Sequence, residues 1–190
     1  MPSHDKLIER QARERVEWKG ERPAVFFDTI AAQPVIGDGL CALCDALLQG
    51  MPARLRELVA LRVSAELDST YVWHGHVRIS CGAVLSRAEI AAVAAGPAAF
   101  GGRDAVVLHA VDELLHRGGL RRATGSALGD DELAVKIATG TYRTIASVMA
   151  GVEREPGIPP VAGLETPDRA RWTHAAITCP PARSDRPAGV

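Results

Sequence analysis

The sequence predicts an all-α fold, on three observations. Alanine and leucine dominate the apolar residues while aromatic residues make up only 4% of the chain, a composition that favours helices over a β-sandwich. Apolar residues recur at helical spacing in segment after segment, and no segment alternates with period two for long enough to indicate a sheet. Glycine and proline separate these segments, as they do between the helices of a helical domain.

The first part of the chain contains signals for three helices. Residues 5–18 are expected to form a short, partly exposed helix, and Pro23 can open a second one because proline suits the first helical turn. Asp38 is a candidate N-cap for a third helix over about residues 40–48, which Gly50 would end.

Two adjoining helices are expected next. Pro52 fits the first turn of a helix whose apolar residues are Leu55, Leu58, Val59 and Leu61. Asp68 or Ser69 could cap the following helix, which would run until Gly82. A turn this short favours packing of the two helices against each other.

The remaining helices have clearer ends. Ser86-Arg87-Ala88-Glu89 has the pattern of a capping box, and Gly96-Pro97 would close the helix that it opens. Residues 103–117 place apolar groups on one face before Gly118-Gly119. A long helix is expected over about residues 130–152, apolar around most of its circumference and therefore buried.

The domain organisation follows from a change of composition near residue 155. Residues 1–155 are expected to form one helical domain, a usual size for a single domain. Residues 156–190 contain seven prolines, which forbid regular helix and predict an extended or disordered arm. A short helix near residues 168–173 is compatible with the sequence.

Charge and hydropathy exclude several classes of function. The net charge is −1, from 22 basic and 23 acidic residues, so there is no electrostatic case for binding nucleic acid or an anionic membrane. No apolar run approaches the ~18 residues of a membrane span, and the first residues lack the apolar core of a signal peptide. Four cysteines without a disulfide-rich composition suit a reducing compartment, so we expect a cytoplasmic protein.

The most informative residues are a glutamate and a histidine on consecutive expected helices. Glu57 shares its helical line with apolar neighbours, and His76 lies on the apolar face of the next helix. Glutamate and histidine are common proton donors and acceptors in enzymes. From the residues alone two plainer interpretations stay open: Glu57 pairs with Arg54 or Arg62 near the surface, and His76 is a satisfied core histidine.

This segment resembles the carboxymuconolactone decarboxylase family, whose relatives include the alkyl hydroperoxidase D-type peroxidases. The redox branch has the order Glu, eleven residues, Cys, two residues, Cys, three residues, His. Here the same spacing gives Glu57, Ser69, Val72 and His76. The carboxylate and the imidazole are kept and both thiols are replaced, so the resemblance implies an alkyl hydroperoxidase D-like helical domain without that branch's chemistry.

The resemblance also implies roles for particular side chains. His76 would be the main proton-transfer group, and Glu57 would orient it or act as the second acid or base. Tyr71 and Trp73 would form walls of a substrate cavity, although packing alone explains them nearly as well. His74 is a further candidate for lining the pocket, with surface exposure as the alternative.

On the last expected helix, Thr139 to Tyr142 interrupt an apolar pattern with small and hydroxylated residues. They are interpreted as one polar wall of the pocket, with Tyr142 as the preferred contributor, or as a site of close helix packing around Gly140.

The cysteine pair Cys41 and Cys44 has the spacing of a redox or zinc motif but lies upstream of Glu57. No second Cys/His pair stands at zinc-ligand spacing, so no metal site is predicted, and the two cysteines are expected to be small core residues. His109 and His116 are weaker site candidates. Cys81 and Cys179 suggest no chemistry.

By this resemblance, the expected function is that of a cofactor-independent lyase or isomerase acting on a small unsaturated carboxylic acid or lactone by general acid–base catalysis. The alternatives are a tailoring enzyme of secondary metabolism on the same fold, a thiol-dependent peroxidase using Cys41 and Cys44, and a non-catalytic ligand-binding oligomer. The expected partners are a small-molecule substrate and further copies of the chain, as a homotrimer or homohexamer, with no nucleic acid or membrane.

Overall fold

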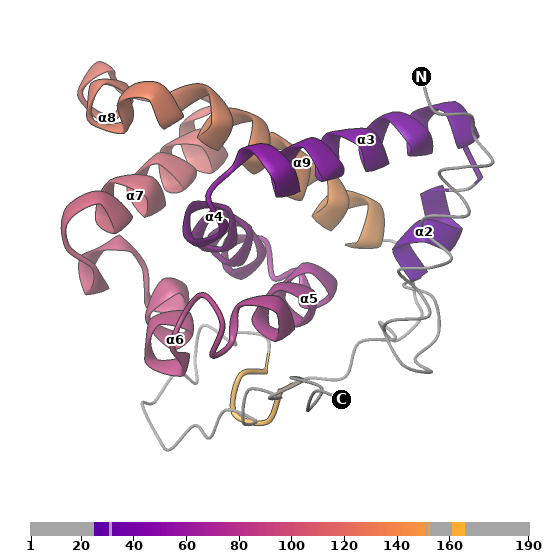
Figure 1. Ribbon diagram of the computed structural model, residues 1–190, viewed down its shortest axis with the longest axis horizontal. Coiled ribbons are helices and arrows are strands. Elements are labelled where there is room, and N and C mark those ends of the chain that lie inside the picture. Colours follow the sequence, from indigo (N-terminus) through magenta and orange to yellow (C-terminus); the bar gives the residue numbers. More distant parts are fainter. Residues whose placement is uncertain (1–24, 31, 151, 153–160, 166–190) are drawn as a thin grey trace, which may run out of the picture.

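The computed structural model describes residues 25–30, 32–150, 152 and 161–165, and every element within them is helical (Figure 1). The α-helices are α2 (Val25–Ile30), α3 (Pro34–Gly50), α4 (Ala53–Glu66), α5 (Thr70–Ser80), α6 (Arg87–Ala95), α7 (Gly102–Arg117), α8 (Arg122–Leu128) and α9 (Glu132–Ala150). Two short 3₁₀ helices, η1 (Pro97–Ala99) and η2 (Gly129–Asp131), lie between them. The predicted all-α class is confirmed.

Helix α4 forms the centre of the fold. It contacts α3, α5, α6, α7 and α9, and Figure 1 shows it nearly end-on among them. Every residue from Leu55 to Ala65 is buried, so the sequence of this helix determines the core. Its charged side chains must therefore find partners inside the protein, because an unpaired buried charge is costly.

Arg62 shows how such a charge is accommodated. Its Nε lies 2.7 Å from Asp112 Oδ1 on α7, and its Nη2 lies 2.7 Å from Glu66 on its own helix. Its Nη1 donates to the carbonyl oxygens of Val93 and Ala94, at the end of α6. One guanidinium thus joins α4 to two surrounding helices.

Several predicted elements are confirmed. Ser86 and Glu89 form the predicted capping box at the start of α6. Gly118 ends α7 with φ +73°, in the left-handed region that favours glycine. Pro52 immediately precedes α4, and Ser69 is the N-cap residue of α5, although its side chain makes no capping hydrogen bond.

Two helix predictions are wrong in detail. Helix α3 begins at Pro34 rather than near residue 40, so Asp38 lies inside the helix and does not cap it; proline in the first turn supplies the start instead. Helix α9 is not buried all round: Leu133 is 67% exposed and Ile137 39%. The helix that is enclosed on all sides is α4. Its sequence does not predict this position, because its charged residues lower its mean hydropathy.

Helix α8 was not predicted, and side chains from α7 explain why it forms. Its residues include Thr124, Gly125 and Ser126, which are weak helix formers. Glu113 accepts hydrogen bonds from the Arg121 backbone N–H and the Thr124 hydroxyl at the start of α8. Arg103 donates to the carbonyl oxygens of Ala127 and Leu128 at its end. Both ends of α8 are thus capped through tertiary contacts.

The expected helices over residues 5–18 and 168–173 lie outside the described residues. Within the expected arm over residues 156–190, only residues 161–165 are described, and they form a turn packed against the helical body. None of the described helices has the length and apolar content needed to cross a membrane.

Candidate acid–base site

Glu57 lies on the central helix α4 with none of its surface exposed. Its position follows from the local sequence, because Leu58, Leu61 and Val63 pack into the same core and hold the helix on all sides. A carboxylate here has no water to solvate it. The groups that face it therefore determine its charge.

His76 reaches this carboxylate from α5. The turn between the two helices uses Asp68 in the left-handed region, at φ 51°, and the Ser69 N–H donates to the Ser64 carbonyl oxygen. His76 Nδ1 lies 2.8 Å from Glu57 Oε2, in hydrogen-bond contact. The prediction that these two side chains come together is confirmed.

Arg56 is a further partner of Glu57, and the sequence did not predict this contact. Its Nε donates to Glu57 Oε1 at 3.0 Å, and its Nη1 donates to the Leu48 carbonyl oxygen at 3.3 Å, in the last turn of α3. The side chain is 8% exposed. Adjacent residues do not share a helix face, so helical spacing gave no signal for this contact.

The two arginines that were considered as partners of Glu57 lie elsewhere. Arg54 pairs with Glu89 at 2.5 Å and Asp104 at 2.7 Å, and Arg62 pairs with Asp112 and Glu66. The interpretation of Glu57 as a semi-exposed partner of either one is wrong.

The electrostatics of Glu57 balance two opposing effects. Burial by itself raises its pKa, but the hydrogen bond from His76, the charge on His76 and the contact with Arg56 together outweigh burial and leave the pKa below the ordinary 4.5. Glu57 is therefore an anion at neutral pH. An anionic Oε2 accepts a hydrogen from Nδ1 of His76, which leaves Nε2 as the second nitrogen of the ring.

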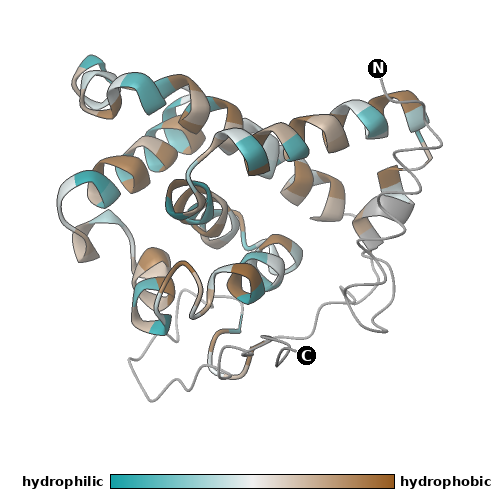
Figure 2. Ribbon diagram, in the orientation of Figure 1, coloured by the Kyte–Doolittle hydropathy of each residue, from teal (hydrophilic) through white to brown (hydrophobic). Residues whose placement is uncertain are grey.

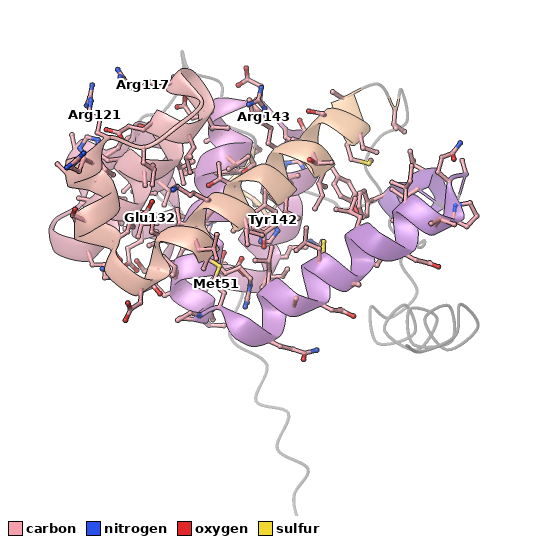
Figure 3. All side chains as sticks on the ribbon, turned by 90° about the horizontal axis from the view of Figure 1, so that it is seen from above. Met51, Arg117, Arg121, Glu132, Tyr142 and Arg143 are labelled. Atoms are coloured by element: carbon pink, nitrogen blue, oxygen red, sulfur yellow. The ribbon has the colours of Figure 1, made fainter. Side chains whose placement is uncertain are left out.

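Tyr142 contacts His76 from α9. Its ring meets the imidazole edge to face, with 4.8 Å between centroids and 85° between planes. Figure 3 shows Tyr142 on the inner side of α9 and the next residue, Arg143, on the outer side. Burial and the Glu57 charge raise the pKa of Tyr142, so its hydroxyl keeps its proton at neutral pH. Tyr142, predicted as part of a polar pocket wall, thus lies against the His76 ring, and its role in binding a substrate stays a prediction.

Tyr71 lies on α5 and packs against Phe26 of α2, with 6.1 Å between ring centroids. Burial raises the pKa of this phenol too, and the charge of Cys44 adds to the effect. Its predicted role as a cavity wall stays a prediction.

Trp73 and His74 lie in a different environment from His76. Trp73 is completely buried, and its indole N–H donates to the Leu164 carbonyl oxygen at 2.9 Å. His74 is buried as well, and its charge contributes to lowering the pKa of Glu165, behind backbone hydrogen bonds. Trp73 therefore contacts the segment over residues 161–165, and His74 lies close enough to this segment for its charge to act on Glu165.

The positions of the redox thiols hold other groups. Ser69 is the N-cap residue of α5, and Val72 belongs to the core. Cys41 and Cys44 lie on α3 as free thiols, and burial raises the pKa of Cys44 to about 11. Cys81, for which no chemistry was assigned, is disulfide-bonded.

The hydroxyls of the suggested polar wall on α9 are already used. Thr139 donates to the Val135 carbonyl oxygen and Thr141 to that of Ile137, both at 2.8 Å. These bonds point the hydroxyls back along their own helix. Of this wall only Tyr142 contacts His76.

The remaining histidine candidates lie on α7, on exposed positions. His116 pairs with Glu66 at 2.7 Å, and Glu66, Asp112 and His116 have the spacing of a possible cation site. Arg62 already pairs with both carboxylates, so a guanidinium supplies the positive charge at this cluster.

Comparison with known proteins gives one match. Residues 34–114 match the model of the Carboxymuconolactone decarboxylase family, a range that contains Arg56, Glu57 and His76 but not Tyr142. No curated protein and no solved structure gave a significant match. Over residues 34–114, which include the contact between Glu57 and His76, the chain is therefore similar to the Carboxymuconolactone decarboxylase family.

Proposed function

We propose that the chain is a cofactor-independent lyase or isomerase that acts on a small unsaturated carboxylic acid or lactone by general acid–base catalysis. The observation that carries this proposal is the 2.8 Å contact between His76 Nδ1 and Glu57 Oε2. A buried anion that orients an imidazole is the usual way to prepare histidine for proton transfer.

His76 is the proposed catalytic residue and Glu57 its positioning partner. Nε2 of His76 makes no hydrogen bond with any residue that the structure describes, and the side chain is 16% exposed. This nitrogen is therefore the one that can exchange a proton with a substrate. The Glu57 anion stabilises the imidazolium that forms when Nε2 takes up that proton.

The same group serves both reactions of the proposal. In an isomerase, Nε2 removes a proton next to the conjugated carbonyl and returns it to another carbon. In a decarboxylase, Nε2 first takes a proton from water to give the imidazolium. The electrons of the breaking carbon–carboxylate bond then move into the conjugated carbonyl, carbon dioxide leaves, and the imidazolium protonates the resulting dienolate and returns to the neutral ring.

Tyr142 is suited to polarise the carbonyl that receives these electrons. Its phenol keeps its proton at neutral pH because burial and the Glu57 charge raise its pKa. Its ring lies against His76. A protonated donor in a water-poor site stabilises developing negative charge on oxygen.

The peroxidase alternative is disfavoured by the state of the thiols. A peroxidase needs a thiolate, and the Cys44 thiol is protonated at neutral pH because burial raises its pKa to about 11. Ser69 and Val72 stand where the redox branch has its two cysteines. A tailoring enzyme of secondary metabolism on the same fold would use the same residues.

The proposal is tested with a panel of unsaturated lactones and carboxylic acids, followed by loss of conjugated absorbance and by release of carbon dioxide. His76→Gln is expected to lower turnover by about 10²–10⁴-fold, the usual contribution of a general acid or base. His109→Gln is the matched control, because it makes the same change at an exposed histidine on α7.

A Cys41→Ser/Cys44→Ser variant distinguishes the proposed acid–base function from the peroxidase alternative. It is expected to keep turnover of the carbon substrate, and the wild-type protein is expected not to reduce peroxide. Loss of turnover in the cysteine variant, with turnover retained by His76→Gln, would overturn the assignment of the chemistry. Binding without turnover would favour the non-catalytic oligomer.

A further inference from the structure

Arg56 carries an inference beyond the acid–base pair itself, although it rests on the proposed function. We infer that Arg56 is a positioning residue, which holds Glu57 as an oriented anion so that His76 keeps its hydrogen on Nδ1 and presents Nε2 to the substrate.

Arg56 is held at two points. Nε donates to Glu57 Oε1 at 3.0 Å, and Nη1 donates to the Leu48 carbonyl oxygen at 3.3 Å. Leu48 lies in the last turn of α3, where backbone carbonyls lack helical partners and attract cations. The side chain therefore joins the end of α3 to the middle of the core, and it has little freedom to move.

Glu57 in turn uses one oxygen for each neighbour. Oε1 accepts from Arg56 and Oε2 contacts His76 Nδ1 at 2.8 Å. This division fixes the carboxylate plane as well as its charge. A chain of contacts thus runs from α3 through Arg56 and Glu57 on α4 to His76 on α5, and Tyr142 on α9 closes it against the imidazole ring.

The charge of Arg56 selects the tautomer of His76. Among the described residues, the ionisable groups in contact with the pair are Arg56 and Tyr142, and Tyr142 keeps its proton at neutral pH. Arg56 is the permanent cation among them. Without it, the Glu57 carboxylate loses the contact that fixes Oε1, so Oε2 holds the hydrogen on Nδ1 less firmly and a larger share of the neutral ring carries its hydrogen on Nε2.

That change would weaken the proposed base. A histidine with its hydrogen on Nε2 has no lone pair on that nitrogen for the substrate. Lysine cannot replace Arg56 fully, because a single ammonium lacks the fixed fork that reaches both Glu57 and Leu48.

The experiment uses nuclear magnetic resonance of the full-length protein and needs no substrate. The ¹⁵N shifts of His76 report its tautomer at mildly alkaline pH, and the ¹³C shift of the Glu57 carboxyl group reports its titration. In Arg56→Met we expect the pKa of Glu57 to rise by roughly one to three pH units. We also expect a smaller share of the neutral His76 ring to carry its hydrogen on Nδ1, because the carboxylate that holds this hydrogen is less firmly oriented.

Two further variants make the result specific. Arg56→Lys keeps the charge and loses the fork, so it is expected to lie between wild type and Arg56→Met, and it remains informative if Arg56→Met does not fold. Arg54→Met is the matched control, because it removes an ion-paired arginine from the same helix that contacts Glu89 and Asp104 instead. It is expected to leave both signals unchanged.

Folded Arg56 variants with wild-type signals for Glu57 and His76 would overturn the inference. That outcome is distinct from failure of the proposed function. If Arg56→Met changes the tautomer while His76→Gln keeps full turnover, the positioning role stands and the proposed catalytic role falls. If the signals do not change while His76→Gln abolishes turnover, the reverse holds.

Discussion

Single side chains explain why a charged helix can form the centre of this protein. Glu57 and Arg62 are both buried, and each is satisfied by groups from neighbouring helices as well as its own. Replacing one member of such a network leaves the others buried and unpaired, which costs more than the pair itself contributes. The contacts that accommodate Glu57 in the core are therefore the same ones that the proposed chemistry uses.

Glu57→Gln tests this link through the pH dependence of stability. The pKa of Glu57 is lower in the folded protein than its ordinary 4.5, so its contribution is complete above about pH 4.5 and is lost as pH falls through the folded pKa. The variant should be less stable at neutral pH and lose less stability on acidification. Urea unfolding across this range measures both effects, and parallel curves for the two proteins would contradict the account.

At the scale of whole helices, some helix ends can be predicted from local sequence alone. The capping box of α6 and the glycine that ends α7 were predicted because they depend on residues adjacent in sequence. Gly118 takes a positive φ of 73°, whereas Gly119, the next residue, does not require one.

Gly118→Ala should therefore cost about 1–2 kcal/mol of unfolding free energy, the usual penalty for a side chain in the left-handed region. Gly119→Ala should stay within about 0.5 kcal/mol, because an added Cβ there meets no atom within 4 Å. Thermal and chemical unfolding of the two variants provide the comparison. Equal costs would show that backbone conformation is not what ends α7.

The features missed by the sequence analysis are those that depend on distant residues. Helix α8 is capped by Glu113 and Arg103 of α7, which no local pattern reveals. Arg56 reaches Glu57 from the adjacent position, which helical spacing excludes. The contact between Glu57 and His76 was predictable because a short turn joins their helices, whereas the environment of Trp73 depends on Leu164, 91 residues away.

At the scale of the whole domain, residues 161–165 pack against the helices. Leu164 is fully buried, its carbonyl oxygen accepts from Trp73 on α5, and Arg87 on α6 donates to the Ala162 carbonyl oxygen at 2.5 Å. This segment therefore belongs to the helical body, which extends the core beyond the range that matches the family.

Leu164→Ala is expected to destabilise the protein by about 2–5 kcal/mol, the usual cost of truncating a buried leucine. Leu133→Ala makes the same change at a side chain that is 67% exposed and should cost no more than about 0.5 kcal/mol. Chemical unfolding checks both. A small cost at Leu164 would show that the segment adds little to the core.

The surface of the domain also bears on whether several copies of the chain assemble. Val35 and Ile36, at the start of α3, are 86% and 70% exposed, and Figure 2 shows hydrophobic colouring at that end of the helix. Exposed apolar surface of this kind often marks an interface. We therefore propose that the chain assembles with further copies of itself, and the family resemblance implies a homotrimer or homohexamer.

Light scattering of the wild-type protein should give one of these masses, and a Val35→Asp/Ile36→Asp variant should give a smaller one. Leu67→Asp, in the turn after α4, is the control and should keep the wild-type mass. A wild-type monomer at micromolar concentration would contradict the proposal.

The most direct measurement of the proposed chemistry is solvent deuterium incorporation during turnover in heavy water. If His76 delivers the proton, the wild-type product carries one deuterium at the reacting carbon, on a single face. His76→Gln should lower the rate of this incorporation by about 10²–10⁴-fold, while His109→Gln keeps the wild-type rate. Incorporation that survives in His76→Gln at the wild-type rate would contradict the assignment of His76 as the proton-transfer group.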